Sequence, residues 1–336
     1  MARSRQEPLG GAHQTETGDT DALPVSGFGH GLSLWSRAWD RLLRKRIAVG
    51  AMVILSILYL GGIFAPLLSP YDYNAQDFST RNEAPSLAHP LGTDWLGRDQ
   101  FTRVLWGLRT TVIITVTSVL SGALPLGLLI GTASGYFGGK FDNAVMRVGE
   151  IFLAFPGLLL VILLAATVKP RVVDMARALE DWGNFRGLVS SGFPDYLVVF
   201  GSLAAFAWVG MARLVRSQVL YLRQAQFVDS ARAAGASTWR IMIVHILPNS
   251  LGPVIVSVSM GMGAAAGSEV VLSWLGIGIQ PPNPSLGRML YEYGSISILR
   301  QYPHLIIFPA AAVSILIFAW NLLGDALSDV FNPRTR

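Results

Sequence analysis

Residues 110–135 read TTVIITVTSVLSGALPLGLLIGTASG, an apolar stretch that contains no charged side chain. An α-helix needs about 20 predominantly apolar residues to cross the hydrocarbon core of a bilayer. Helices in soluble proteins rarely run so long without a charge, because one of their faces usually meets water. The stretch therefore predicts a membrane-spanning helix and an integral membrane protein.

The same character recurs in five other stretches, which predicts an all-α membrane protein with six transmembrane helices. Within the apolar cores of these stretches the one charged residue is Glu269. The composition agrees, since 51% of the 336 residues are hydrophobic and 14% are charged, whereas soluble domains carry about 25% charged residues. With their ends included, the predicted spans are 47–68, 110–135, 148–168, 196–217, 251–279 and 302–324.

Basic residues indicate how these spans are oriented. With the N-terminus inside, Lys and Arg are more numerous in the cytoplasmic segments than in the external ones, as the positive-inside rule requires. The external residues Lys169, Arg171, Arg177 and Arg186 work against this assignment. We expect a multi-pass protein of the cytoplasmic membrane with both termini in the cytoplasm. The connecting segments are then an external loop (69–109), an external insert (169–195), a cytoplasmic loop (218–250) and a cytoplasmic C-terminus (325–336).

The segment before the first span has two parts. Residues 1–31 are polar and rich in Gly, Thr, Asp and Gln, which predicts a disordered cytoplasmic tail. Residues 32–46 predict an interfacial amphipathic helix that contacts membrane lipid, because apolar residues recur at helical spacing opposite a basic face. The alternative is an ordinary cytoplasmic helix. The apolar positions are Trp35, Ala38, Trp39, Leu42 and Leu43.

Two features inside the predicted spans indicate particular roles. Gly127, Gly131 and Gly135 lie four residues apart, a spacing that lets helix backbones approach closely in lipid. Glu269 is a carboxylate in an apolar segment, and such a group faces either a water-filled path or the interior of the helix bundle. Glu269 is therefore a candidate to line a path, with a structural hydrogen-bond anchor as the alternative.

The cytoplasmic loop contains the sequence DSARAAG at 229–235 and the sequence HILPN at 245–249. Asp229 is expected to cap a short helix, because a carboxylate satisfies free amides at a helix N-terminus. Gly235 can take the positive φ that ends this helix, and a second helix is expected over 237–246. Pro248 is expected to stop that second helix before the fifth span.

This arrangement resembles the EAA motif in the permease subunits of ATP-binding-cassette (ABC) importers. Asp229 stands in place of the usual glutamate, and Ser230 in place of the first alanine. The resemblance implies a coupling helix that docks on an ATPase subunit, and the alternative is an amphipathic loop helix without that role. The residues that the resemblance assigns to ATPase coupling are Asp229, Ser230, Ala231, Arg232, Ala234, Gly235, Ala236, His245, Leu247 and Pro248.

The external loop carries a second pattern, HPLGTD at 89–94 followed by GRD at 97–99 and by Arg103. It is similar to a stretch of the dipeptide, oligopeptide and nickel permeases, in the half usually called the C subunit, except that Thr102 stands where serine is usual. The likeness covers about residues 42–334 and implies the type I ABC importer permease fold. The motif residues are His89, Gly92, Asp94, Gly97, Arg98, Asp99 and Arg103.

The resemblance implies that the chain forms half of a translocation path for short peptides. The expected partners are a second homologous permease subunit in a heterodimer, two ABC ATPase subunits and an extracytoplasmic solute-binding protein. ATP and magnesium would bind to the ATPases, so the chain is expected to be no enzyme and to bind no cofactor, metal or nucleic acid. The residues expected to line the path are Glu269, Ser273, Trp274 and Met260.

Several alternatives stay open at this point. Nickel chelates, glutathione-like compounds and oligosaccharides use similar permeases. A gradient-driven secondary transporter is another alternative, although such folds usually show internal repeats and several intramembrane ionisable groups. The insert at 169–195 is hypothesised to dock or gate the solute-binding partner, or else to be a lid without a role in recognition.

Overall fold

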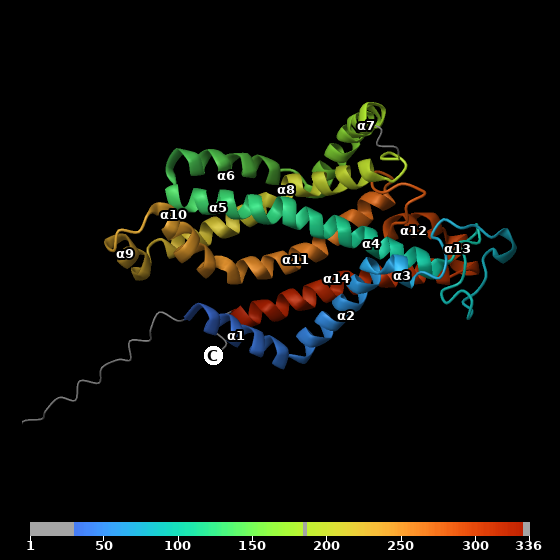
Figure 1. Ribbon diagram of the computed structural model, residues 1–336, viewed down its shortest axis with the longest axis horizontal. Helices are drawn as coiled ribbons and strands as arrows, with labels where there is room; N and C mark the ends of the chain where they lie inside the picture. Colours follow the sequence, from blue (N-terminus) through green and yellow to red (C-terminus); the bar gives the residue numbers. More distant parts are fainter. Residues whose placement is uncertain (1–29, 184–186, 332–336) are drawn as a thin grey trace, which may run out of the picture.

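The computed structural model describes residues 30–183 and 187–331, which are mostly α-helical. Most of the predicted tail at 1–31 therefore lies outside the described residues. Figure 1 shows an elongated bundle with α9 and α10 at one end and α12 and α13 at the other. The longer helices are α1 (His30–Arg44), α2 (Arg46–Ile63), α4 (Gln100–Ser118), α5 (Leu124–Phe137), α6 (Gly139–Leu153), α7 (Gly157–Gly183), α8 (Phe193–Leu222), α11 (Leu247–Trp274) and α14 (His304–Phe331). The shorter ones are α3 (Ala65–Leu68), η1 (Phe78–Thr80), η2 (Val119–Ala123), α9 (Gln226–Ala233), α10 (Thr238–Arg240), η3 (Ile241–Ile246), α12 (Leu286–Tyr293) and α13 (Ile296–Gln301).

Five helical segments in the described residues are long and apolar enough to cross a membrane. A sixth is added if α6 and α7 together count as one span. The segments extend beyond the apolar cores, so that the predicted span 110–135 lies within the continuous segment Gln100–Phe137. The additional helical residues, such as 100–109, include polar and charged side chains. Hydropathy alone therefore does not assign them to a span.

Two of these long segments contain a π-helical turn that ends two residues before a proline. η2 precedes Pro125, and η3 precedes Pro248. Proline has no N–H, and its ring collides with the carbonyl four residues earlier in a regular α-helix. The wider π-helical turn accommodates this collision, so the helix continues from Thr238 to Trp274. The prediction that Pro248 stops the segment is therefore wrong.

At Pro156, by contrast, the chain does break. α6 and α7 form an angle of 88° across the residues between Leu153 and Gly157. The residue before a proline is sterically driven away from the α-helical region, which explains the position of the break. The predicted span 148–168 thus contains parts of two helices, and Figure 1 shows α7 rising steeply from the bundle.

Helix α7 continues through much of the predicted insert at 169–195. Lys169 holds it against its neighbours, because the Lys169 ammonium lies 2.8 Å from Asp195 at the start of α8. The same ammonium donates hydrogen bonds of 3.2 Å to the carbonyl oxygens of Ile277 and Gly278, which follow α11. The base of the insert is therefore attached to two other helices.

The glycines of α5 pack directly on α8. A Cβ on Gly131 would lie 2.6 Å from the carbonyl oxygen of Ala212, and one on Gly135 would lie 2.7 Å from Cβ of Val219. Real Cβ atoms do not approach other atoms so closely, so only glycine fits here. This is the close packing of helix backbones that the glycine spacing predicts.

Helix α1 packs partly on α14. Leu42 is buried together with Ala326, Leu327 and Val330 of α14, whereas Trp39 is exposed. Part of the apolar face that was predicted to contact lipid is therefore covered by protein. A position of α1 on the membrane surface stays a prediction.

Candidate functional site

The cytoplasmic loop at 218–250, called the coupling loop below, contains α9 and α10. Helix α9 begins at Gln226, three residues before Asp229, and no side chain caps its first residues. Asp229 instead lies in the first turn and forms an ion pair of 3.2 Å with Arg232. The prediction that Asp229 caps this helix is therefore wrong, although its charge still suits the positive end of the helix dipole.

Gly235 ends α9 in the way the sequence predicts. Its φ is +79°, in the left-handed region that favours glycine. The Gly235 N–H donates to the Arg232 carbonyl at 2.9 Å, and the Ala236 N–H donates to the Ala231 carbonyl at 3.0 Å. These two bonds are the Schellman pattern, which satisfies the last carbonyls of a helix. Ser237 then accepts a hydrogen bond from the Arg240 N–H and begins α10.

Helix α9 is fixed to the bundle on one side and open on the other. Val228 is fully buried among Val219, Ile241 and Ile246. Most of its other residues are exposed, and so is Trp239 of the neighbouring α10, at 64%. No heavy atom would lie within 4 Å of a Cβ on Gly235. The exposed coupling residues are Asp229, Ser230, Arg232, Ala234, Gly235 and Pro248, and the half-buried ones are Ala231, Ala236, His245 and Leu247.

At the other end of the bundle, Asp94 is the centre of a buried polar network, called the external cluster below. Its carboxylate accepts hydrogen bonds of 2.7 Å from Nε of Arg98 and from Nη1 of Arg103, and one of 2.9 Å from the Tyr293 hydroxyl. Glu292 lies 3.5 Å from Arg98 and 3.3 Å from Arg103. Glu292 also pairs with Arg288 at 3.1 Å, so Asp94 and Glu292 together face three guanidinium groups. These contacts join the external loop to α12.

The other residues of the external motif shape the loop around this cluster. Gly92 and Gly97 have φ of +80° and +74°, and a Cβ on Gly97 would overlap the carbonyl oxygen of Asp77. Asp99 caps α4 by accepting a 2.8 Å hydrogen bond from the Thr102 N–H, and it also contacts Nδ1 of His89 at 2.9 Å. The structure thus brings all seven residues of the predicted external motif into one folded unit.

Opposing effects act on the titration of Asp94. Burial by itself would raise the pKa of its carboxyl, because the charged form loses hydration. The positive charges of Arg103 and Arg98, with hydrogen bonds from Arg98, outweigh this effect and hold the pKa below the ordinary value of 3.8. Asp94 is therefore ionised at neutral pH.

The four predicted path residues do not form one site. Glu269 is fully buried and accepts hydrogen bonds from the hydroxyls of Thr111, Ser273 and Ser285 at 2.7, 2.9 and 3.1 Å. These contacts join α4, α11 and the start of α12, which is the geometry of a structural anchor. Trp274 is 48% exposed and packs edge-on against Tyr291. Met260 lines a cavity of about 480 Å³ between α8, α11 and the end of α14.

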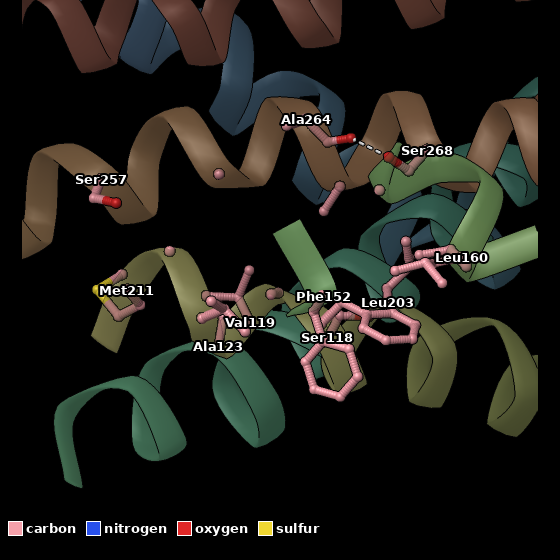
Figure 2. Close-up of a pocket in the computed structure, with 18 of the residues that line it drawn as sticks. Ser118, Val119, Ala123, Phe152, Leu160, Leu203, Met211, Ser257, Ala264 and Ser268 are labelled. Carbon is pink, nitrogen blue, oxygen red and sulfur yellow. Dashed lines mark hydrogen bonds between the residues drawn. The ribbon is translucent and has the colours of Figure 1, made fainter. Parts of the chain in front are cut away.

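Another cavity, of about 360 Å³, lies between α8 and α11 and is also lined by α4, η2, α6 and α7. Figure 2 shows Ser257 and Ser268 of α11 on one side of it and Leu203 and Met211 of α8 on the other. Apart from Val258, the residues of α11 that line it are small or carry hydroxyl groups. They are Ser257, Gly261, Ala264, Ala265 and Ser268, on one face of the helix. Sequence reasoning missed this site, although their helical spacing was a usable signal.

Three glycines in this cavity are not required by packing. A Cβ on Gly157, Gly210 or Gly261 would have no heavy atom within 4 Å. They differ in this from Gly131, whose Cβ would collide with α8. The cavity glycines therefore keep open a space that the chain itself does not fill.

Comparisons with known proteins agree with this architecture. Residues 123–336 match the model of the family described as binding-protein-dependent transport system inner membrane component. Residues 33–85 match the N-terminal transmembrane domain of oligopeptide transport permease C.

Curated proteins resemble the chain over most of its length. A glutathione transport system permease protein of Pectobacterium atrosepticum is 37% identical over 90% of this chain and 92% of its own. A dipeptide transport system permease protein of Bacillus subtilis is 35% identical over 91% of this chain and 87% of its own. An oligopeptide transport system permease protein of the same organism is 33% identical over 91% of both chains. This chain therefore belongs to the binding-protein-dependent transport permeases, the membrane subunits of ABC importers, in the group that contains the dipeptide and oligopeptide permeases.

Proposed function

We propose that the chain forms one half of the translocation path of an ATP-driven importer of short peptides. In this proposal, conformational changes of the ATPase subunits are transmitted to the chain through the coupling loop. The observation that carries the proposal is α9, a short helix that is fixed to the bundle through Val228 and exposed on its outer side. Its turn at Gly235 lies in open space at one end of the molecule, as Figure 1 shows for α9. ATP is bound and hydrolysed on the partner subunits, and this chain performs no chemistry.

The packing of α9 supports a route by which a displacement of this helix reaches the membrane-spanning helices. Val228 lies in one cluster with Val219 of α8 and with Ile241 and Ile246 of η3. Because this cluster is tightly packed, a displacement of α9 acts on both α8 and the start of α11. The same two helices line the cavity with the open glycines. Closure of the ATPases would thus change the width of that cavity.

The lining of the cavity supports a peptide as the solute. Ser118, Ser257 and Ser268 contribute hydroxyls among apolar side chains, which suits a solute with amide groups and small side chains. The related permeases are named for dipeptides, oligopeptides and glutathione, all of which contain peptide bonds. The positive-inside distribution supports an orientation with α9 and α10 in the cytoplasm and α12 and the external cluster outside.

Co-purification tests the coupling role. Gly235→Val introduces a β-branched residue at positive φ and should distort the end of α9. The matched control is Gly139→Val, which also has positive φ and no neighbour within 4 Å, but lies at the start of α6. Tagged wild type and Gly139→Val should retain a second permease and two ATPases in mild detergent, whereas Gly235→Val should lose the ATPases. A wild-type chain that purifies without any ATPase would refute the importer proposal.

Transport tests the path. Gly210→Leu and Gly261→Leu add side chains to the cavity from α8 and from α11, at positions where a Cβ has no heavy atom within 4 Å. Each should abolish uptake of alanyl dipeptides by the reconstituted transporter and leave its assembly intact. Gly201→Leu is the control, because Gly201 lies on α8, is equally unobstructed and does not line the cavity. Normal uptake by both cavity variants would exclude this cavity as the path.

A further inference from the structure

A cleft of about 630 Å³ lies between α6 and α8, adjacent to the cavity and closer to α9. Its lining residues on α6 are Asn143, Met146, Arg147 and Glu150, which share one helical face. Less than one helical turn beyond Glu150, Phe152 and Leu153 line the cavity. On α8, Gly210 and Met211 line the cavity, and Arg213 and Arg216 line the cleft. The cleft thus continues the proposed path toward the cytoplasmic end.

The two spaces differ in charge. The residues that line the cavity include no ionisable side chain, whereas four of the six cleft residues are charged. A charged group that travels through the apolar cavity has no counterion there, and its desolvation is costly. The cleft is the first place along α6 and α8 where an anion meets positive charge.

The arginines of the cleft are paired unequally. Arg216 holds Asp142 in a two-point contact, with Nη2 at 2.6 Å from Oδ2. Arg147 and Arg213 instead share Glu150, at 3.8 Å and 4.0 Å. Three arginines face two carboxylates, which leaves one net positive charge. The guanidinium groups of Arg147 and Arg213 come from opposite walls of the cleft and are both exposed.

We propose that Arg147 and Arg213 bind the carboxylate of the transported solute as it leaves the cavity toward the cytoplasm. Guanidinium groups bind carboxylates by parallel N–H···O bonds, and the long contacts to Glu150 are readily exchanged for a closer anion. The binding is weak because both arginine side chains are exposed to solvent, and weak binding allows release. The proposal rests on the proposed function and adds that the solute carries a free carboxylate.

Cysteine labelling tests the cleft directly, because the chain contains no cysteine of its own. Asn143→Cys places a thiol in the cleft at an exposed position. In the assembled transporter, a sulfonate-bearing methanethiosulfonate should label it faster than a trimethylammonium-bearing one. Adding Arg213→Gln should change each rate about fivefold in opposite directions, the effect of one unit charge at about 4 Å in water. Arg300→Gln, an exposed arginine of α13, should change neither rate.

Protection identifies the ligand. Alanyl-alanine added on the cytoplasmic side should slow labelling of Asn143→Cys, and its C-terminal amide should not. Equal protection by both peptides, or by neither, would overturn the proposal. If the sulfonate reagent labels the cysteine slowly in phosphatidylglycerol nanodiscs and fast in phosphatidylcholine nanodiscs, an anionic lipid headgroup occupies the cleft instead, which would also overturn the proposal.

Measurements of peptide uptake distinguish a failure of the carboxylate site from a failure of the proposed transport function. If the wild-type transporter moves no peptide, the proposed function fails. If the wild type moves alanyl-alanine but Arg213→Gln moves it equally fast, the carboxylate site alone fails. We expect Arg213→Gln to lower the uptake of alanyl-alanine about tenfold while ATPase subunits stay bound.

Discussion

The substitution Asp94→Asn should destabilise the external end of the protein strongly. Asparagine keeps the size of the side chain but removes the charge that Arg98 and Arg103 face at 2.7 Å. Removing one partner of a buried ion pair costs about 3–5 kcal/mol, because the other charge is left without compensation. Glu292 remains 3.3 Å from Arg103 and still compensates part of its charge. We therefore expect a loss of unfolding free energy at the lower end of this range, about 3 kcal/mol. For a chain of 336 residues that corresponds to a decrease of about 4 °C in Tm.

Thermal unfolding of the purified protein in detergent measures this decrease, and trypsin reports where it arises. Arg98 is buried in the wild type and should become a site of cleavage in the variant. Asp174→Asn is the control, because Asp174 belongs to an exposed ion pair with Arg177 and should change Tm little. A Tm of Asp94→Asn within about 1 °C of wild type, with Arg98 still protected, would refute the reasoning.

The pH dependence follows from the depressed pKa of Asp94. The unfolded carboxyl titrates near 3.8 and the folded one below it, so its stabilising contribution is fully present above 3.8 and is lost as the pH falls through the folded pKa. The Tm difference between wild type and Asp94→Asn should therefore stay constant from pH 8 to pH 5 and shrink only below 3.8. A difference that already disappears near pH 6 would contradict the assigned ion pairs.

Three further predictions concern other parts of the bundle. Glu269→Ala should lower Tm by about 4 °C, because three buried hydroxyls lose their acceptor at about 1 kcal/mol each, whereas Glu269→Gln should lower Tm by less than half of that. Equal decreases in Tm for the two variants would contradict the role of Glu269 as a structural anchor. Lys169→Met should speed hydrogen exchange in the outer half of α7, since the contact with Asp195 is lost, and unchanged exchange would show that Lys169 does not hold α7. Gly131→Ala should lower Tm and separate α5 from α8, because its Cβ would lie 2.6 Å from the Ala212 carbonyl; Gly50→Ala, where no atom lies within 4 Å, is the control and should be tolerated.

The membrane-spanning segments could be predicted well because lipid imposes a simple requirement on each stretch separately. Any segment that crosses the bilayer must be apolar over about 20 residues. Hydropathy measures this from the segment alone, whichever helices pack beside it. The turn at Gly235 was predictable for a similar reason, since its positive φ depends on the residue itself. The family also followed from short sequence patterns, and the comparisons confirm it.

Proline shows where such local reasoning stops. Pro125, Pro156 and Pro248 are the same residue in similar apolar surroundings, yet the chain breaks only at Pro156. At the other two, a π-helical turn preserves the helix. Whether the backbone can widen in this way depends on the helices packed around it, and that information does not lie within a few residues of the proline.

The sequence alone determined the all-α class, most of the membrane segments, the turn that ends α9 and the family. These properties depend on the transfer of each segment into lipid or on the conformational preference of single residues. Only the tertiary structure decided that Glu269 is enclosed by hydroxyls, because Thr111 comes from a helix 158 residues away in the chain. It also decided that the open glycines of α8 and α11 surround one cavity and that Arg147 and Arg213 face each other beside it. Contacts between distant segments depend on how whole helices pack, and no single stretch of sequence contains that information.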